Sequence, residues 1–307
     1  MAVPTQPTIA NLMTEAYKKV GIASPSTDQL TRAETYFFEE VKNDIWIRSG
    51  RMGERHLAAL ENQACQITTD GQSKYSFPTD FDEEAGDLEF LDGDHADTVG
   101  AASTGDNSIT FASDEDAAEA DVVGKYIILT GGTGVSTPGT TLGIRQARTY
   151  STSTKVALVD ANWATNPSTD TTYRIINKIT KLQKENVKDK GFLGNTSLYE
   201  SSTPSAYTKV TEDGSKKFIL DTNPDASTYG IYYRYYVNLM KTDTAGSLHN
   251  NLLYNWRGAL TSGVAWKIAE DEDDDKYQVF KQEYEKEVQF LLEKESPGED
   301  EFEGFEL

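Results

Sequence analysis

Few side chains in this sequence belong to the types that catalyse reactions or hold transition metals. The chain has 50 Asp and Glu residues, but only three His and one Cys. The histidines, His56, His95 and His249, lie far apart in the sequence, without the short spacing that paired metal ligands from one segment show. We therefore expect structural or surface roles for them and predict no metal site.

One segment resembles a calcium-binding loop. Residues 92–97 read Asp-Gly-Asp-His-Ala-Asp, which places carboxylates at alternate positions. Such a loop needs glycine at its sixth position and a bidentate Glu at its twelfth, but this chain has Asp97 and Ser103 there. A dedicated calcium site is therefore not predicted, and an adventitious ion is the alternative.

The sequence also contains neither a glycine-rich phosphate-binding motif nor a recognisable motif for a catalytic nucleophile. The segment 131–143 is rich in glycine, but no Gly-Lys-Ser or Gly-Lys-Thr follows it, so it is better explained as loop. Gly-x-Ser-x-Gly is absent, and Cys65 has no nearby base. Paired carboxylates are uninformative in a chain with 50 acids. We predict that the chain is not an enzyme and binds no cofactor.

The amino-acid composition limits which partners the protein can bind and in which cellular compartment it is expected. The formal charge of -21 repels phosphate backbones, so sequence-specific DNA binding is not expected, although a protein that encloses a duplex without gripping it is compatible with this charge. One cysteine excludes an intrachain disulfide. No basic and apolar leader and no run of 18 apolar residues occur. We expect assembly in a cytoplasm, without a membrane partner.

The elements that must position these side chains fall into three blocks. Helical periodicity covers residues 1–62 and returns over residues 248–295, whereas residues 98–178 alternate as strands between Gly, Ser and Thr turns. Thr8 is the expected cap of the first helix, and Gly21 is its expected stop. Further helices are expected at residues 27–48, 54–62, 179–190, 249–270 and 275–295.

Strand signals occur inside the middle block and on both sides of it. Residues 71–81 run from a strand into a turn, because Pro78 removes a backbone donor and biases Phe77 away from helix. Phe77 and Phe81 are expected core anchors, together with Trp46 and Trp256. Other strands are expected at residues 65–68, 88–91, 108–111, 126–130, 144–150, 155–159, 173–176, 217–220 and 229–239.

These patterns predict an α+β fold in which a helical bundle carries a small antiparallel sheet and an inserted all-β domain of the sandwich or barrel type. The expected parts are the first part of the bundle with its strand-turn (1–94), the inserted β domain (95–178), sheet strands with the closing helices (179–295), and a flexible acidic tail (296–307).

Six segments carry a family resemblance: Ile9-Ala-Asn-Leu-Met13, Tyr36 to Trp46, Tyr75-Ser-Phe-Pro-Thr-Asp-Phe81, Tyr229 to Leu239, Asn251-Leu-Leu-Tyr-Asn-Trp256 and Asp274 to Leu292. Through these segments, about two thirds of the chain resembles the head-to-tail adaptor proteins of tailed bacteriophages, especially those of short-tailed phages.

The resemblance implies a structural virion protein at the neck, where twelve copies form a ring beneath the portal protein and line the channel for double-stranded DNA. The partner below would be a tail nozzle or tail tube protein. Twelve copies would place about 250 negative charges around the channel, which limits adhesion of passing DNA. The family's C-terminal segment reaches onto the portal, and here Phe302, Phe305 and Leu307 would make that contact.

Two alternatives belong to other classes. A tail component could bind host-surface carbohydrate through its β insert, with Trp163, Tyr126, Tyr150 and Tyr173 stacking on sugars. Exposed, coplanar aromatic rings would favour that function, whereas buried rings would favour the adaptor. A hydrolase with divergent carboxylate chemistry is the least supported alternative.

Overall fold

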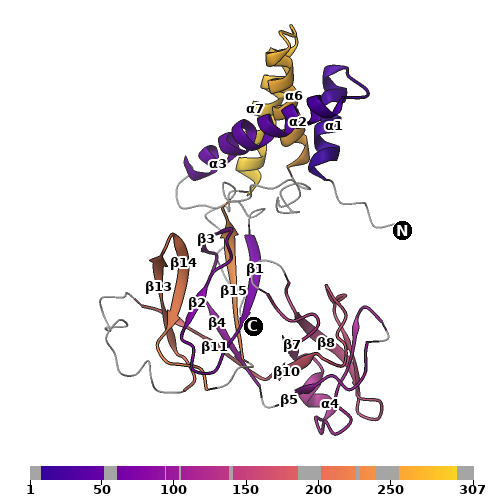
Figure 1. The fold of residues 1–307 in the computed structure, drawn as a ribbon, viewed down its shortest axis with the longest axis vertical. Helices are drawn as coiled ribbons and strands as arrows, with labels where there is room; N and C mark the ends of the chain where they lie inside the picture. Colours follow the sequence, from indigo (N-terminus) through magenta and orange to yellow (C-terminus); the bar gives the residue numbers. More distant parts are fainter. Residues whose placement is uncertain are drawn as a thin grey trace. The chain divides into compact units, whose positions relative to one another are not determined.

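The computed structural model describes residues 8–51, 61–93, 95–103, 105–137, 141–185, 202–225, 229–238 and 256–295. The chain divides into two compact units, Met1–Glu61 with Tyr236–Leu307 and Asn62–Tyr235. The first unit is built from helices and the second mostly from strands (Figure 1). One unit therefore takes both ends of the chain, and the other is the segment between them.

Local sequence signals set where the first helices begin and end. The Oγ1 of Thr8 accepts a hydrogen bond from the backbone N–H of Asn11 at 3.2 Å, and Gly21 ends the helix at φ 97°, a left-handed conformation that suits glycine. Ser26 and Gln29 form a capping box at the next helix. The elements are α1 (Ile9–Val20), α2 (Thr27–Tyr36), the π-helical turn η1 (Phe37–Val41), α3 (Lys42–Arg51), α6 (Arg257–Asp271) and α7 (Tyr277–Glu295).

The π turn corrects the spacing of an apolar face. Ala33, Phe37, Val41 and Ile45 recur every four residues, and all four are buried. In a regular α-helix of 3.6 residues per turn, such a repeat drifts around the axis. The wider turn of η1 offsets the drift, so the four side chains reach the same core. The continuous α-helix expected over residues 27–48 is therefore interrupted by a π turn.

Helix α6 lies at the centre of the helical core, and residues 259–265 are all buried. Gly263 marks its closest approach to its neighbours, because a Cβ there would lie 2.9 Å from ring carbons of Tyr284 and 2.9 Å from Cγ1 of Val41. Trp256, just before α6, is fully buried in the same core. The core thus joins helices from both ends of the chain.

The strand unit contains three sheets. One has the order β1 (Glu61–Ile67), β15 (Gly230–Val237), β4 (Glu89–Asp92) and β11 (Lys178–Lys181), with β3 (Phe81–Glu84) also paired to β15. A four-stranded sheet has the order β12 (Gln183–Lys184), β13 (Ala206–Glu212), β14 (Ser215–Leu220) and β2 (Lys74–Ser76). The third has the order β5 (His95–Thr98), β10 (Thr172–Ile176), β7 (Tyr126–Gly131), β8 (Ile144–Ser151), β9 (Val156–Val159) and β6 (Ser108–Thr110).

Aromatic side chains link the first two sheets. The rings of Phe77 and Phe81 stack with centroids 3.9 Å apart, and Phe77 also meets Phe218 of β14 and Tyr233 of β15. Tyr233 and Tyr235 are both buried while Arg234 between them is exposed, so β15 alternates as a strand with one buried face. The tyrosine-rich run is therefore a core strand.

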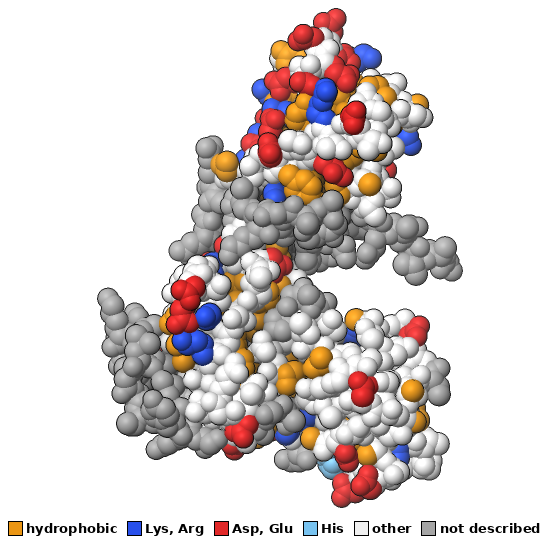
Figure 2. Space-filling model, viewed as in Figure 1, with side chains coloured by type: hydrophobic (Ala, Val, Ile, Leu, Met, Phe, Trp, Pro, Cys, Tyr) orange, Lys and Arg blue, Asp and Glu red, His pale blue; other side chains and the backbone are white. Residues whose placement is uncertain are grey.

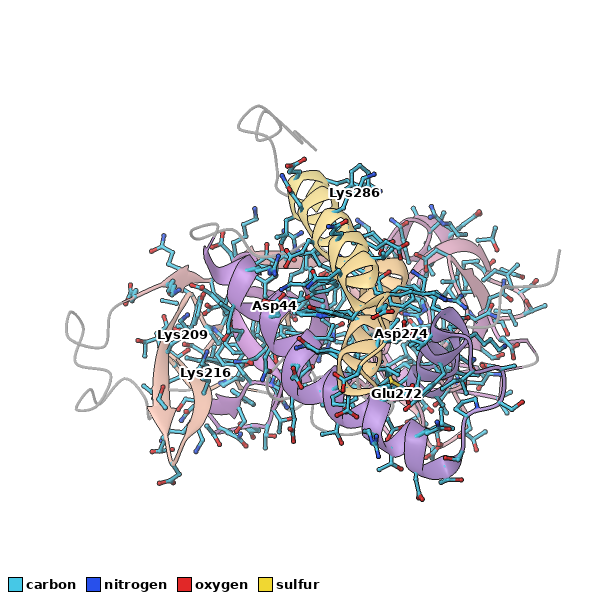
Figure 3. The ribbon with its side chains drawn as sticks, turned by 90° about the horizontal axis from the view of Figure 1, so that it is seen from above. Asp44, Lys209, Lys216, Glu272, Asp274 and Lys286 are labelled. Carbon is cyan, nitrogen blue, oxygen red and sulfur yellow. The ribbon has the colours of Figure 1, made fainter. Side chains whose placement is uncertain are left out.

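Two lysines also join the four-stranded sheet to β3, and Figure 3 labels both. The ammonium of Lys209 lies against the carboxylate of Glu84, whose side chain is only 4% exposed. The ammonium of Lys216 donates to the backbone carbonyl of Asp82. A charge as buried as that of Glu84 requires such a partner, so this pair fixes β13 beside β3.

The six-stranded sheet has a core of its own. Ile127 and Leu129 of β7 and Ile175 of β10 pack there with Trp163. The indole Nε1 of Trp163 donates to the backbone carbonyl of Ser108 at 3.0 Å. The short helix α4 (Glu119–Val122) contributes Val122 to the same cluster.

The predicted fold class is wrong. Strands take 34% of the structure and helices 30%, and the strands form three sheets, so the chain is not a helical bundle with a small sheet. Residues 179–181 and 183–184, expected in a helix, lie in β11 and β12, and Ala206 and Tyr207, expected at the end of a loop-rich segment over 192–207, begin β13. Mixed charged and apolar residues at 178–182 fit a helix face as well as an edge strand, and pairing of Ile179 with Leu91 decides for the strand.

Candidate interaction surface

Helix α7 has one apolar face and, on its opposite side, two exposed apolar side chains with the charged residues Glu283 and Lys286 between them. The apolar face packs in the helical core through Phe280, Tyr284 and Val288. On the opposite side, Val279 and Phe290 are 53% and 62% exposed. These two lie eleven residues apart, about three turns or 16 Å along the axis, and so on the same side of the helix. We call the pair the α7 stripe.

Two depressions lie along α7. A groove of about 870 Å³ runs along α7 beside Arg48 of α3 and reaches Leu292. A second depression of about 490 Å³ is lined by Lys19 of α1, by Phe290 and by charged residues of α7. Phe290 therefore stands as an apolar ridge at the edge of the second hollow, where a complementary side chain can pack.

A charged network fixes α3 to α7 at the edge of the groove. The guanidinium of Arg48 lies 2.7 Å from Asp44 and donates to Glu285 at 2.9 Å. The Tyr284 hydroxyl donates to Asp44 at 2.7 Å, beneath Arg48, whose guanidinium lies 5.7 Å from the ring centroid. Hydrogen bonds from Arg48 lower the pKa of the Glu285 carboxyl, and burial raises the pKa of Tyr284. Glu285 therefore stays ionised, and Tyr284 and Arg48 stay protonated, near neutral pH.

Further charged groups surround the α7 stripe. Lys19 donates to Ser262 at 2.8 Å and pairs with Glu283 at 3.1 Å. The ammonium groups of Lys267 and Lys281 lie 4.1 Å and 5.1 Å from the ring centroid of Trp266. Figure 2 shows acidic side chains gathered at the end of the helical unit where α6 meets α7, the turn in which Figure 3 labels Glu272 and Asp274. An apolar ridge with a polar rim is typical of protein interfaces.

The chain matches no protein-family model and no curated protein. Among the described helices, none is both long and apolar enough to span a membrane.

Some of the residues predicted from the sequence to be core anchors or site residues lie in the described structure, and others lie outside it. Phe77, Phe81 and Trp256 are buried at 5%, 1% and 0% exposure. Trp46 lies within α3, and its side chain is outside the described part of the structure. The tail residues of the docking hypothesis, and two of the three histidines, also lie outside the described residues: Phe302, Phe305, Leu307, His56 and His249.

The aromatic residues of the carbohydrate alternative do not form an exposed platform. Trp163, Tyr150 and Tyr173 are 5%, 6% and 1% exposed, and only Tyr126 is open to solvent at 43%. Buried rings cannot stack on a sugar. The observation on which that alternative depends is therefore missing for three of its four residues.

Cys65 has a packing role. Its side chain is fully buried in an apolar cluster with Leu91, Ile128 and Ile176. Burial raises the pKa of the thiol to about 12, so the reactive thiolate is scarce at neutral pH.

The α7 stripe was not identified from the sequence. The sequence signal was present, because Val279 and Phe290 fall outside the i, i+4 series of Phe280, Tyr284, Val288 and Leu292. A helix with two apolar series has more hydrophobic surface than one core can cover.

Proposed function

We propose that this chain is a structural virion protein of a tailed bacteriophage, which forms a ring beneath the portal, joins head to tail and lines the DNA exit channel. The observation that carries the proposal is the α7 stripe: two large apolar side chains exposed on a helix of the unit that both chain ends build. In an assembly, a neighbouring subunit would bury these two side chains and remove their apolar surface from water.

The proposed occupant of the α7 stripe is a neighbouring copy of the same chain. A closed ring uses heterologous contacts, so each subunit needs two different faces that fit each other. The α7 stripe supplies one face. Ile47 on α3, 52% exposed, is the other large apolar side chain exposed among the described residues of the helical unit, and it supplies a second.

The proposed partners follow from the same arrangement. The portal protein would bind the ring from above, a tail nozzle or tail tube protein would bind from below, and the ring would contain twelve copies. Double-stranded DNA would pass without sequence-specific binding, because the charge of -21 per chain repels it. In this proposal no bond is made or broken and no cofactor is needed, and the protein resides in the neck of the virion after assembly in the host cytoplasm.

The tail is the proposed portal contact. Residues 296–307 carry five acidic side chains together with Phe302, Phe305 and Leu307. Three large apolar residues in so short a segment can fill grooves on a partner. Deleting residues 296–307 is expected to weaken portal attachment without changing the thermal unfolding of the chain. Unchanged attachment, measured by surface plasmon resonance on immobilised portal, would remove the docking role.

Substitutions in the α7 stripe test ring formation. The double variant Val279→Glu with Phe290→Glu places charges where the neighbouring copy would pack. A matched control adds the same two charges on α2 at the exposed residues Thr31 and Thr35. By mass photometry of mixtures with portal, we expect rings from the wild type and the control, and none from the stripe variant. Rings from the stripe variant would contradict the proposed interface.

A further inference from the structure

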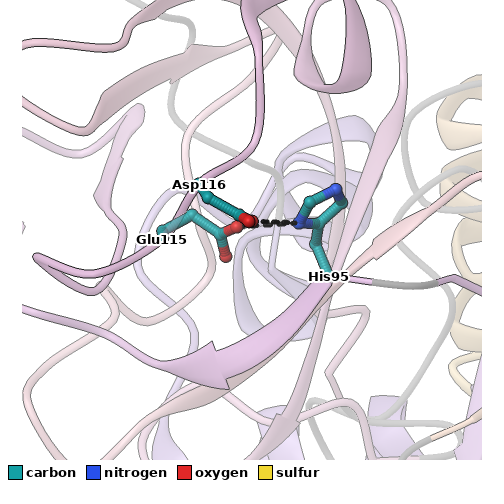
Figure 4. Close-up of side chains that lie close together, drawn as sticks. All are labelled: His95, Glu115 and Asp116. Atoms are coloured by element: carbon teal, nitrogen blue, oxygen red, sulfur yellow. Dashed lines mark hydrogen bonds and ion pairs between the residues drawn. The ribbon is translucent and has the colours of Figure 1, made fainter.

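Three potential metal ligands converge in the strand unit, outside the surface described above. His95 begins β5, an edge strand, whereas Glu115 and Asp116 lie between β6 and α4. The Nδ1 of His95 lies 2.8 Å from Oε1 of Glu115 and 3.6 Å from Oδ1 of Asp116. Figure 4 shows this nitrogen facing both carboxylates. Ligand atoms of all three lie within 4.8 Å of one another.

These separations are close to those that a metal ion imposes. In a tetrahedral zinc site with bonds of about 2.1 Å, neighbouring ligand atoms lie about 3.4 Å apart. The Asp116 contact is within 0.2 Å of that value, and the Glu115 contact would open by about 0.6 Å to admit an ion. A side-chain adjustment of this size needs no rearrangement of the backbone.

Two hydrogen-bond donors outside the ligand set hold the buried carboxylate of Glu115 in its orientation. The side chain of Glu115 is 5% exposed. Its Oε2 accepts a hydrogen bond from the Tyr173 hydroxyl at 2.7 Å, and its Oε1 accepts another from the backbone N–H of Ala117 at 3.1 Å. A carboxylate oxygen has two acceptor sites, so Oε1 keeps one for the direction of His95. Outer partners of this kind fix the ligands of metal sites.

The electrostatics of the cluster favour a divalent cation. Two carboxylates face one imidazole, and Asp116 is 92% exposed, which leaves the cluster open to an incoming ion. The nearby cation is Lys155, whose ammonium donates to the backbone carbonyl of Glu115 at 2.6 Å and not to its carboxylate.

We propose that His95, Glu115 and Asp116 form a binding site for a divalent ion of the zinc type, with water completing the coordination. Imidazole with carboxylates suits such an ion better than calcium, which takes six to eight oxygen ligands. The bound ion takes the lone pair of Nδ1 of His95 and ties the edge strand β5 to the segment before α4. Its role is structural, and it is independent of the proposed ring.

Zinc titration of the purified full-length chain tests the site. Isothermal titration calorimetry with Zn²⁺ is expected to show one ion per chain, with proton release and with affinity that falls as the pH drops towards 5. His95→Gln is expected to abolish binding, and Asp116→Asn, which changes an exposed side chain, is expected to weaken it at least about 10-fold. The double variant His56→Gln with His249→Gln is the control and is expected to bind as the wild type does.

A spectroscopic readout separates a ligand from a residue that only supports the fold. Co²⁺ in place of Zn²⁺ is expected to give visible d–d absorption in the wild type and in the His56→Gln, His249→Gln control, but not in His95→Gln. No Zn²⁺ binding by the wild type, or binding retained in His95→Gln, would overturn the proposal. The cluster would then be a hydrogen bond between His95 and Glu115 and nothing more.

Discussion

Gly263 illustrates how one residue sets the packing of three helices. A methyl group there would meet Tyr284 and Val41 at 2.9 Å, closer than carbon atoms approach. We predict that Gly263→Ala lowers the free energy of unfolding by about 1–3 kcal/mol despite the better helix propensity of Ala. At Gly258 of the same helix a methyl group would meet the flexible end of Glu287, so Gly258→Ala is the control and should be neutral or stabilising. Urea unfolding compares the two, and equal effects would contradict the packing account.

Glu285 provides a prediction on pH. Arg48 lowers the folded-state pKa of this carboxyl below the ordinary value of 4.5, so the pair stabilises the fold above that pH. The stabilisation is lost as the pH falls through the lowered pKa, because the carboxyl then takes up a proton. We therefore expect Glu285→Gln to reduce stability at pH 7 and to match the wild type near pH 2. Chemical unfolding at both pH values measures this, and a difference that does not change with pH would refute it.

Single residues also show what a sequence can reveal about a site. Phe77 and Phe81 lie four residues apart around a turn at Pro78, and that local pattern is enough to suggest that they pack together. The partner of His95 lies twenty residues further along, in a segment with many other acids. Nothing in the local sequence distinguishes Glu115 from those acids, and only the pairing of strands brings it to His95.

Helix caps act at the scale of one element. Thr8 accepts a hydrogen bond from the backbone N–H of Asn11 at the start of α1, where the helix offers that N–H no partner of its own. Thr8→Ala is expected to cost about 1 kcal/mol of unfolding free energy. Thr14→Ala, within the same helix, removes only a hydroxyl that bonds back to the carbonyl of Ala10, so little or no loss is expected. Thermal unfolding of both variants tests the capping role, and equal losses would count against it.

At the same scale, helices and strands differ in how far neighbouring residues in the sequence determine where they form. The start and end of α1 follow from Thr8 and Gly21, both of which can be read in the sequence. Strand β11 depends on β4, a partner that lies about 90 residues away in the chain, whereas β13 forms a hairpin with the next strand, β14, across the turn Asp213-Gly214. Pairing with a distant strand overrides the local pattern, and for this reason the helix expected from residue 179 is wrong over residues 179–184, whereas residues 186–190 of that helix lie outside the described residues.

At the scale of the whole molecule, the amount of sheet could not be predicted from the sequence. Strand signals before and after the middle block were assigned to one small sheet, whereas the described strands of these segments form two sheets, beside the six-stranded sheet of the middle block. The aromatic contacts of Phe77 with Phe218 and Tyr233 join segments about 140 and 156 residues apart, so no local pattern could indicate them. The absence of catalytic motifs and the charge of -21 are, by contrast, direct properties of the sequence.

The central proposal concerns assembly, and one measurement tests it most directly: cryo-electron microscopy of this chain mixed with the purified portal protein of its own virus. The account predicts a closed ring of copies on the portal, with Val279 and Phe290 of each copy buried against the next. A chain that stays monomeric beside the portal, or a ring in which the α7 stripe remains exposed to solvent, would contradict it.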